Sequence, residues 1–443
     1  MPINSFLYPA KHVPGAFEVA NSLRFNSGDS PSLSRTSGGS PSSTTKGTFS
    51  FWLKRSKLGI NDRFVTTNSL SDPYFQMYFD SNASRLDQIR LQCYNGSAGS
   101  VLELITNQKF RDNSAWYNII LSYDSTPSTP SSSSIKLFVN GTQVTSFATA
   151  TYPSQNQNHY FNQGLMRLSG YGASSSDHTD GYMAEVVYCD GQALNADSFG
   201  EFDSDSPTIW KPIDVSGLTF GTNGFYLDFE DSSALGNDAN GSNDFTVNNL
   251  TAIDQSTDTC TNNYATLNPL VNSAITYSEG NLHYKNTHGS NSEFTLATIQ
   301  EVSNGRWYWE IKMASTNNNS AYEYFGNGTA YVKSNGDIYP SGTTTVSNGD
   351  IFGFYLNYED GQMTIHRNGS QVYQSSSGIS LSTTTAQIAA FNNTEYQLNF
   401  GNPIFSISSG NADANGYGNF EYSPVLSGVN FYSLCTKNLA EYG

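Results

Sequence analysis

The sequence predicts an all-β protein made of two β-sandwiches in tandem, and three observations support this fold class. Short segments with period-two alternation of apolar and polar residues follow one another along the chain, whereas runs of ten or more residues at helical period are nearly absent. Ser, Thr, Asn and Gly supply most of the polarity, and these residues suit turns and solvent-facing strand positions. A strand-turn-strand pattern occurs twice, as IKLFVNGTQV at residues 135–144 and as MTIHRNGSQV at residues 363–372.

The repeated pattern indicates two sandwiches of similar construction. Asn-Gly is the strongest local signal for a β-hairpin, because both central residues of a type I′ turn need positive φ. Each copy follows an aromatic-rich strand that ends in polar or acidic turn residues, WYNIILSYD in the first case and IFGFYLNYEDG in the second. We therefore expect each sandwich to contain the same central hairpin.

Composition and charge narrow the classes of function. Charged residues make up only 13% of the 443 residues, and aromatic residues make up 14%. A disordered chain typically has many charged and few aromatic residues, so the composition indicates a folded protein. The formal net charge of −17 repels phosphate groups, so we expect neither nucleic acid nor anionic membranes as partners. Such a surface suits neutral sugars, or anionic glycans that a divalent cation bridges.

Cysteine spacing and hydropathy indicate where the protein is made and folded. Residues 1–17 contain no apolar core of signal-peptide length, and the chain contains no run of about 18 apolar residues. We expect no membrane insertion, and synthesis and folding in a cytoplasm. The cysteines are widely spaced without a CxxC pair, so four isolated thiols are expected in place of a zinc site or a disulfide framework. These residues are Cys93, Cys189, Cys260 and Cys435.

The order of the predicted strands divides the chain into five segments. Residues 1–18 form an N-terminal arm, and residues 19–200 hold the short, regularly spaced strands of a first sandwich. Residues 201–275 form a less regular connector whose strands partly complete the first sandwich. A second series of strands, which includes GRWYWEIKMAS and DIFGFYLNYEDGQ, fills residues 276–406, and an irregular tail occupies residues 407–443.

Both strand series resemble known families. Residues 19–200 resemble a laminin-G-like, concanavalin A-like domain in the order of SAWYNIILSYDS, IKLFVNGTQV, LMRLSGYG and DGYMAEVVYCDGQAL, although Ala184 replaces an Asp that often precedes the Glu. Residues 276–406 are similar to a SPRY domain in GRWYWEIKM, NGDIFGFYLNYEDGQMTIHRNG and LNFGNPIF. The stretch between AYEYFGNG and NGDIFGF is short, so SPRY-type peptide recognition is not implied. The resemblances imply two concanavalin A-like jelly-roll β-sandwiches in tandem.

The combination of the two domains, with SLRFN and LSRT at the front and FYSLCTKNL at the back, resembles virion proteins of tailed bacteriophages. That resemblance implies a structural role on the virion surface, as a tail fibre or a capsid-surface appendage, after synthesis in the host cytoplasm. It implies other virion proteins as partners and leaves the copy number open, a homo-oligomer included. The arm at residues 1–18 is too short for a tail-anchoring domain, so we expect it to dock as an extended peptide on another virion protein.

Paired carboxylates would indicate a glycanase, since the sandwich family includes glucanases. Glycosidic cleavage needs two carboxyl groups about 5–9.5 Å apart, which an alternating Glu/Asp run on one strand face would supply. The segment EFDSDSP, with Glu201, Asp203 and Asp205, lacks the final Glu and runs into Pro207. The segment LDFED does no better. We expect an acidic surface loop at EFDSDSP and assign no catalytic residue.

Metal-binding patterns are also incomplete. The six histidines include no HExxH and no close pair with ligand spacing, and we interpret His159, His178 and His366 as solvated loop or strand residues. Calcium is a candidate cofactor because the run from residue 228 to residue 244 offers several oxygen ligands. Turns in which Asx side chains bond their own backbone explain the same run without a metal. The candidate calcium ligands are Asp228, Asp231, Asp238 and Asp244.

Sugar binding needs aromatic faces for pyranose C–H surfaces and amide or carboxylate groups for hydroxyls. The loops YPSQNQNHYFNQG and GYGASSSDHTDGY, at residues 152–164 and 170–182, supply both kinds of group. Aromatic residues are plentiful, so packing is the competing role for each of them. We assign Trp52, Trp116, Trp307 and Trp309 to packing. The candidate glycan-binding residues are Tyr160, Tyr171, Asn158 and Asp177.

Three functions follow in order of preference. The first is a non-enzymatic protein displayed on a phage particle, whose weak sites bind host-surface glycans and gain avidity from many copies. The second is a purely structural decoration or connector protein that binds other virion proteins and no sugar. The third is a glycanase that cleaves host-surface polysaccharide.

Overall fold

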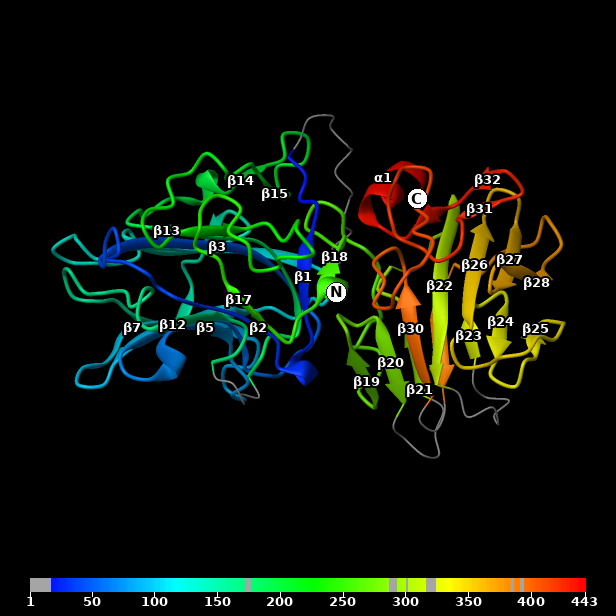
Figure 1. The fold of residues 1–443 in the computed structure, drawn as a ribbon, viewed down its shortest axis with the longest axis horizontal. Helices are drawn as coiled ribbons and strands as arrows, with labels where there is room; N and C mark the ends of the chain where they lie inside the picture. Colours follow the sequence, from blue (N-terminus) through cyan, green and yellow to red (C-terminus); the bar gives the residue numbers. More distant parts are fainter. Residues whose placement is uncertain are drawn as a thin grey trace. The chain divides into compact units, whose positions relative to one another are not determined.

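The chain folds into two compact units whose regular structure is mainly β-strand (Figure 1). One unit spans Gly15–Thr261 and the other contains Asn262–Gly443. Strands hold 42% of the residues and helices 5%, which confirms the predicted all-β class. Residues 1–16 of the predicted arm lie outside the described residues. The computed structural model describes residues 17–171, 177–286, 293–299, 302–315, 324–383, 386–390 and 394–443.

The first unit consists of two eight-stranded sheets, drawn as two layers in Figure 1, and a small strand pair. We call the sheet with the first NG hairpin the hairpin sheet; it contains, in spatial order, β10 (Thr142–Gln143), β9 (Ile135–Val139), β8 (Trp116–Asp124), β3 (Lys46–Arg55), β13 (Gly181–Asp190), β1 (Ser22–Phe25) and β18 (Gln255–Ser256), with β16 (Phe225–Leu227) paired to β13. We call the other sheet the facing sheet; it contains β11 (Phe147–Thr151), β7 (Gly99–Lys109), β6 (Gln88–Asn95), β5 (Tyr74–Phe79), β4 (Asp62–Thr66), β12 (Leu165–Leu168), β2 (Ser32–Thr36) and β17 (Thr246–Asn248). The small pair is β14 (Gly200–Phe202) with β15 (Trp210–Pro212), and 3₁₀ turns lie at Ser27–Asp29, Asn68–Leu70, Ala196–Ser198 and Ala252–Asp254.

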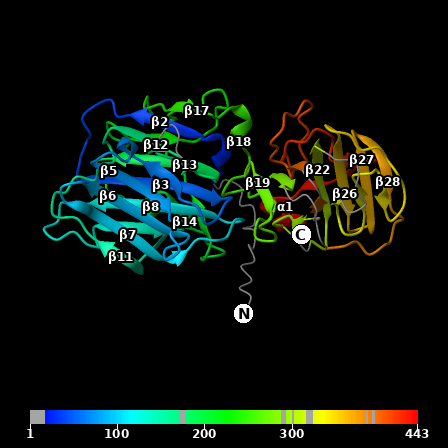
Figure 2. The ribbon, with the colours of Figure 1, turned by 90° about the horizontal axis from the view of Figure 1, so that it is seen from below.

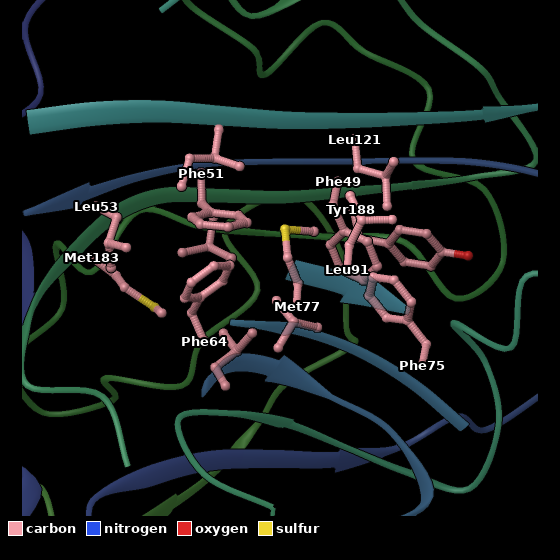
Figure 3. Packing of buried hydrophobic residues seen from close by; sticks show 14 of the residues in the cluster. Phe49, Phe51, Leu53, Phe64, Phe75, Met77, Leu91, Leu121, Met183 and Tyr188 are labelled. Carbon is pink, nitrogen blue, oxygen red and sulfur yellow. The ribbon is translucent and has the colours of Figure 1, made fainter. Parts of the chain in front are cut away.

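Period-two alternation places one face of each strand in the core between the two sheets. Figure 3 shows aromatic and aliphatic side chains of the hairpin sheet packed against those of the facing sheet. The rings of Phe49 on β3 and Phe75 on β5 stack with centroids 6.0 Å apart. Phe161, from the loop before β12, closes against both rings at 5.1 and 4.5 Å. Apolar side chains from strands that lie far apart in the sequence therefore form one continuous core between the two sheets.

The outer face of the hairpin sheet is covered by later parts of the chain. Ile120 and Val187 of this sheet are buried with Phe199 and Val215, which follow β13 in the sequence. Trp52 and Trp116 belong to a second outer cluster, so their predicted packing role is confirmed. Among the described residues, no apolar cluster lies on the outer face of the facing sheet, which leaves that face open.

The segment predicted as a connector, residues 201–275, contributes to both units. Its residues form β15, β16, β17 and β18, which pair within the first unit. The second unit begins at Asn262 in the division of contacts. All four cysteines are free thiols, as predicted.

The second unit also contains a hairpin sheet and a smaller facing sheet. Its hairpin sheet contains β19 (Ile275–Ser278), β20 (His283–Asn286), β30 (Glu395–Asn399), β22 (Arg306–Ser315), β26 (Ile351–Asn357), β27 (Gln362–Arg367) and β28 (Ser370–Gln374), with β33 (Tyr432–Ser433) parallel to β22. Its facing sheet contains β21 (Glu293–Leu296), β29 (Gln387–Ala390), β23 (Tyr324–Gly326), β24 (Tyr331–Lys333) and β25 (Ile338–Tyr339). The remaining elements are β31 (Val425–Leu426), β32 (Val429–Asn430) and α1 (Thr436–Tyr442). Trp307 and Trp309 are fully buried in its core, in agreement with their predicted packing role.

The two units share one strand topology. In the hairpin sheets the order β10-β9-β8-β3-β13-β1 corresponds to β28-β27-β26-β22-β30-β20. In the facing sheets β6-β5-β4-β12-β2 corresponds to β25-β24-β23-β29-β21. The corresponding strands also follow each other in the same order along the chain, so the second unit is a smaller version of the first sandwich. The predicted pair of similarly built sandwiches is confirmed.

The two NG hairpins are alike in detail. Asn140 and Gly141 have φ of 48° and 73°, and Asn368 and Gly369 have φ of 49° and 78°, as a type I′ turn requires. The backbone N–H of Asn118 donates to Asn140 Oδ1 at 2.8 Å, and in the second hairpin a strand N–H donates to Asn368 Oδ1 at 2.9 Å. Each Asn side chain thus ties its turn to the preceding strand.

An aromatic ring from a downstream segment covers each turn glycine. A Cβ added to Gly141 would lie 2.2 Å from Trp210 Cε3, and one added to Gly369 would lie 2.9 Å from Tyr422 Cδ1. We expect Gly141→Ala to lower the free energy of unfolding by about 2 kcal/mol, because positive φ and ring overlap both oppose the methyl group. Urea unfolding measures the loss. Gly99→Ala is the matched control, since Gly99 has φ of 75° but no atom within 4 Å of an added Cβ; an equal loss in both variants would contradict a role for Trp210.

The tail at residues 407–443 covers the hairpin sheet of the second unit. Tyr308 and Tyr355 point away from the core and are buried with Phe420 and Phe431 of the tail. The tail also supplies the parallel strand β33. In each unit, chain that follows the sandwich therefore covers the outer face of the hairpin sheet.

Candidate functional site

A row of polar side chains crosses the outer face of the first facing sheet. Figure 2 shows β2, β12, β5, β6, β7 and β11 of this sheet side by side. Directly paired residues of neighbouring strands point to the same face, and the residues that alternate with this row, such as Leu91 and Met77, are buried in the core. We call this set the polar row; from β11 to β17 it consists of Thr151, Glu103, Gln92, Gln76, Thr66, Arg167, Ser34 and Thr246.

Hydrogen bonds between side chains fix the centre of the polar row. Gln76 Nε2 donates to Gln92 Oε1 at 2.7 Å, and Gln92 Nε2 donates to Ser100 Oγ at 2.6 Å. Arg63 Nη1, from the neighbouring strand β4, donates to Gln76 Oε1. Both glutamines are buried, each only 5% exposed, and these neighbours hold their amides in fixed directions.

Tyrosine side chains flank the polar row on β5 and β6. Tyr74 and Tyr94 are directly paired, and their rings stack with centroids 5.1 Å apart and an angle of 18° between planes. Both rings are half-buried. Burial raises the pKa of Tyr74 above its usual value, so its hydroxyl stays protonated at neutral pH. The pair presents apolar ring surface next to the amide groups of the row.

On the opposite side of the polar row, charges are paired with each other. The guanidinium of Arg63 lies 4.5 Å from the ring centroid of Tyr78 and 5.2 Å from that of Tyr171, and its Nε donates to Asp177 at 2.9 Å. Arg90 Nε donates to Glu103 at 2.9 Å in the same way. These two arginines are neutralised locally, so this side of the polar row suits an uncharged ligand, while Arg167 in the row itself donates to the neutral acceptors Ser69 Oγ and Tyr171 O at 2.7 and 3.2 Å.

A polar hollow of about 380 Å³ lies where the polar row ends, beside β2, β12 and β17. Four hydroxyl groups line it together with an arginine, an amide and a carboxylate, and Leu165 adds apolar surface. Its volume is in the range of small-molecule sites, although its lining is more polar than most. The lining hydroxyls belong to Ser34, Thr36, Ser242 and Thr246.

Arg35 is the fixed cation of the hollow. Its Nη1 donates to the backbone oxygen of Asn223 at 3.1 Å, and its Nη2 donates to Asn243 Oδ1. Burial lowers the pKa of Arg35, while the nearby carboxylates of Asp238 and Asp244 act in the opposite direction. The guanidinium therefore orients Asn243 at the wall of the hollow. Hydroxyl, amide and guanidinium groups in this arrangement can bind a polyhydroxylated ligand.

The structure separates the four residues predicted to bind glycan. Tyr160 is buried, with its hydroxyl accepting from Asn95 Nδ2 at 3.0 Å, so its ring packs in the core instead of offering a face to solvent. Asn158 Oδ1 accepts from the backbone N–H of Tyr160 at 2.7 Å and so stabilises the loop. Tyr171 and Asp177 lie together at Arg63, next to the polar row. Residues 172–176 between them lie outside the described residues.

The four predicted calcium ligands do not form one group. Among the described residues, no three or more His, Cys, Asp or Glu side chains are placed to hold a metal ion. Asp238 is buried and its carboxylate accepts backbone N–H groups of Tyr226 and Asn243 at 2.9 and 3.0 Å. Asp244, Asp231 and Asp228 each accept a backbone N–H within the same loops, at 2.9, 2.8 and 3.1 Å. Backbone capping by Asx side chains accounts for all four.

The acidic segment examined for catalysis is anchored on a lysine. Asp203 accepts from the backbone of Asp205 and Ser206 at 2.8 and 2.9 Å, and Lys211 Nζ lies 3.0 Å from its carboxylate. Glu201 is exposed and lies 3.8 Å from the same lysine. Glu201 and Phe202 belong to β14, and residues 203–209 form the turn that leads to β15, so the predicted acidic loop is correct only for the second part of EFDSDSP.

Glu185 is an acidic residue whose environment the sequence did not reveal. It lies at a bulge of β13 with φ of 50°, and Tyr226 donates to its Oε2 at 2.7 Å. Burial, helped by Asp228 and Glu230, raises the pKa of Glu185 to about 8. The carboxyl group is buried beneath the cover of the hairpin sheet, away from the open face.

The histidines were interpreted from the sequence as solvated loop or strand residues, and the structure corrects this for His159 and His178, which are buried because segments distant in the sequence pack against them. His159 is buried, its ring stacks on Phe161 with centroids 4.2 Å apart, and its Nδ1 accepts from the backbone N–H of Phe161 at 3.0 Å. Burial lowers the pKa of His159 to about 4, so the ring is neutral at physiological pH. His178 is buried as well.

The polar row was missed because sequence reasoning looked for sites in loops. The signal was present in PYFQMYF and QIRLQCYN, where Tyr, Gln and Arg alternate with core residues. Alternation alone does not say which strands become neighbours, so the row could not be assembled from it. Within the described part of the chain, no helix is long and apolar enough to cross a membrane.

Residues 27–198 match the family model of the Concanavalin A-like lectin/glucanases superfamily, and no curated protein sequence matches the chain. Similar solved structures include a putative carbohydrate binding protein from Bacteroides ovatus ATCC 8483, at 15% identity and a TM-score of 0.38, covering 53% of this chain and 60% of that chain. Domains LG4-5 of the mouse laminin alpha1 chain match at 11% identity and a TM-score of 0.31, covering 97% and 91%. The SPRY domain of human HERC1 matches at 12% identity and a TM-score of 0.26, covering 30% and 96%. Residues 27–198 thus carry a concanavalin A-like lectin fold.

Proposed function

We propose that this protein is a non-enzymatic structural protein of a bacteriophage particle, and that its first sandwich binds a neutral glycan of the host surface along the polar row. The observation that carries the proposal is the polar outer face of the facing sheet, where half-buried stacked tyrosines and internally paired arginines flank the buried, ordered amides of Gln76 and Gln92. The phage origin rests on the sequence resemblance alone. The superfamily match agrees with a binding role for residues 27–198.

The chemistry of the face fits an uncharged sugar chain. The rings of Tyr74 and Tyr94 offer apolar surface for pyranose C–H groups, and the half-buried side chains of Ser100 and Glu103 beside them offer hydrogen-bonding groups for hydroxyls. The hollow at the end of the row has room for a sugar unit or a branch. Such open sites bind weakly one at a time, and many copies on a particle raise the overall avidity.

A glycan array with the full chain tests the proposal, followed by titration calorimetry with a soluble oligosaccharide from the array. We expect Tyr74→Ala/Tyr94→Ala to weaken binding at least tenfold, because the variant loses the ring surface beside the row. Phe202→Ala is the matched control, since Phe202 is an exposed aromatic residue on β14 outside the facing sheet. Retention of no glycan by the wild-type chain, with and without calcium, would reject glycan binding and favour the purely structural alternative.

Two further measurements separate the remaining alternatives. Immunogold labelling of particles from the phage that encodes this chain should place it on the tail or the capsid surface, and unlabelled particles would reject the virion role. Incubation with host polysaccharide should release no reducing ends. Release of reducing ends would establish the glycanase alternative.

A further inference from the structure

The second facing sheet carries a continuous row of three tyrosine rings. Tyr324 on β23, Tyr331 on β24 and Tyr339 on β25 lie on three neighbouring strands. The ring centroids of Tyr324 and Tyr331 are 4.7 Å apart, and those of Tyr331 and Tyr339 are 4.8 Å apart with an angle of 7° between planes. Tyr339 is 48% exposed on the edge strand of the sheet.

The register places these rings on the outer face. Phe325 pairs with Val332, and Val332 pairs with Ile338; all three are buried in the core of the second unit. Tyr331 and Tyr339 alternate with those core residues and pair directly with each other. They therefore point away from the core, toward the side that no apolar cluster of the described residues covers.

The tyrosine row occupies the position of the first site in the shared topology. Strands β24 and β25 correspond to β5 and β6, which carry the stacked pair Tyr74 and Tyr94. The stacked pair in the second unit, Tyr331 and Tyr339, is also directly cross-strand paired and also faces outward. The two units thus present the same feature at the same place in the fold.

The surroundings of the tyrosine row suit a ligand with both apolar and hydroxyl surfaces, and Lys333, which pairs directly with Tyr324, adds a hydrogen-bond-donating cation to the same face. Leu296, Gln387 and Gly326 complete the line that contains Tyr331 and Tyr339. Gly326 adds no side chain beside Tyr331, and the ring of Tyr324 from the same strand fills that space, with its centroid 4.7 Å from that of Tyr331. Burial raises the pKa of Tyr331, so its hydroxyl remains a neutral donor and acceptor.

We propose that the outer face of the second facing sheet is a second glycan-binding site, centred on Tyr331 and Tyr339, for the same class of neutral glycan as the polar row. This inference rests on the proposed function of the first site. One chain would then bind two glycan segments, and a surface dense in that glycan would hold it more tightly than either site alone.

The experiment uses the full chain and a soluble oligosaccharide that the glycan array identifies. Titration calorimetry should give a stoichiometry of two for the wild type and one for Tyr331→Ala/Tyr339→Ala. On a surface coated with the glycan, the same variant should lose at least tenfold in apparent affinity. Val425→Ala is the control, as an exposed apolar residue of the second unit outside the facing sheet; it should match the wild type.

The outcomes distinguish this inference from the proposed function. A wild-type stoichiometry of one that Tyr331→Ala/Tyr339→Ala leaves unchanged would overturn the second site and leave the first intact. If Tyr331→Ala/Tyr339→Ala loses all binding while Tyr74→Ala/Tyr94→Ala binds as tightly as the wild type, the result would support the second site and overturn the first. A self-association that the Tyr331→Ala/Tyr339→Ala change abolishes would identify a second copy as the occupant and overturn the inference. If the double variant misfolds, the single variant Tyr339→Ala can be used, because Tyr339 lies at the exposed edge of the sheet. It should still lower the stoichiometry or the affinity of glycan binding. A titration that equals that of the wild type would overturn the inference.

Discussion

Replacing Glu310 with Ala is expected to destabilise the second unit by about 3–5 kcal/mol. Glu310 is fully buried on β22, and its carboxylate accepts from the backbone N–H groups of Glu421 and Tyr422 at 3.1 and 2.8 Å. It also accepts from Tyr308 Oη at 2.9 Å and from Asn399 Nδ2 at 3.0 Å. Its removal leaves these donors unpaired in the interior and releases the tail from the hairpin sheet.

Hydrogen exchange tests this prediction with residue resolution. The amides of Glu421 and Tyr422 should exchange faster in Glu310→Ala, and urea unfolding should give the loss of stability. Glu359→Ala is the matched control, because Glu359 is half-exposed and pairs with Arg306 at the surface; it should change stability by less than about 0.5 kcal/mol. Unchanged exchange at Glu421 and Tyr422 would show that the carboxylate does not hold the tail.

Replacing Glu185 with Gln is expected to remove a pH dependence from the stability of the first unit. The pKa of Glu185 is about 8 in the folded chain because of burial, whereas an unfolded Glu has a pKa of about 4.3. Between these values the folded state keeps a proton that the unfolded state has released, so stability falls as pH rises from about 4.3 to about 8. Each unit of pKa corresponds to about 1.4 kcal/mol, so the full loss amounts to several kcal/mol.

Unfolding free energies at pH 5 and pH 9 measure the effect. A Gln side chain still accepts the hydrogen bond from Tyr226 and carries no charge, so the variant should nearly equal the wild type at pH 5 and exceed it clearly at pH 9. Glu201→Gln serves as the control because Glu201 is exposed, and it should show no such difference between the two pH values. A wild type that stays as stable as Glu185→Gln at pH 9 would contradict a protonated Glu185 in the folded chain.

The sequence resolved the local features of the fold well. Alternation in WYNIILSYD puts Ile119, Leu121 and Tyr123 on one face of the strand, and the structure buries this face in the core between the sheets. The opposite face, with Trp116 and Ile120, is buried as well, because later chain covers it. Alternation reports that a strand has two faces, but it does not report what covers the second one.

The residues of the candidate site were predicted less well than the strands, because the prediction depended on which way loop side chains face. Tyr171 and Asp177 do lie next to the polar row through Arg63. Tyr160 has a similar loop context in the sequence but packs into the core, where its ring joins the cluster between the sheets. A loop aromatic faces either way depending on how its loop closes, and that closure depends on contacts distant in sequence.

By itself, the sequence determined the strand pattern, the two NG turns and the repeated sandwich, because alternation and positive φ are properties of a few neighbouring residues. The tertiary structure alone decided which faces remain open and which residues stand together on them. The polar row takes one residue from each strand of the facing sheet, and these residues span the sequence from Ser34 to Thr246. The tyrosine row likewise joins three strands of the second unit. Only the pairing of strands far apart in the chain brings such residues to the same face, since a side chain's neighbours across a sheet are set by register and not by sequence distance.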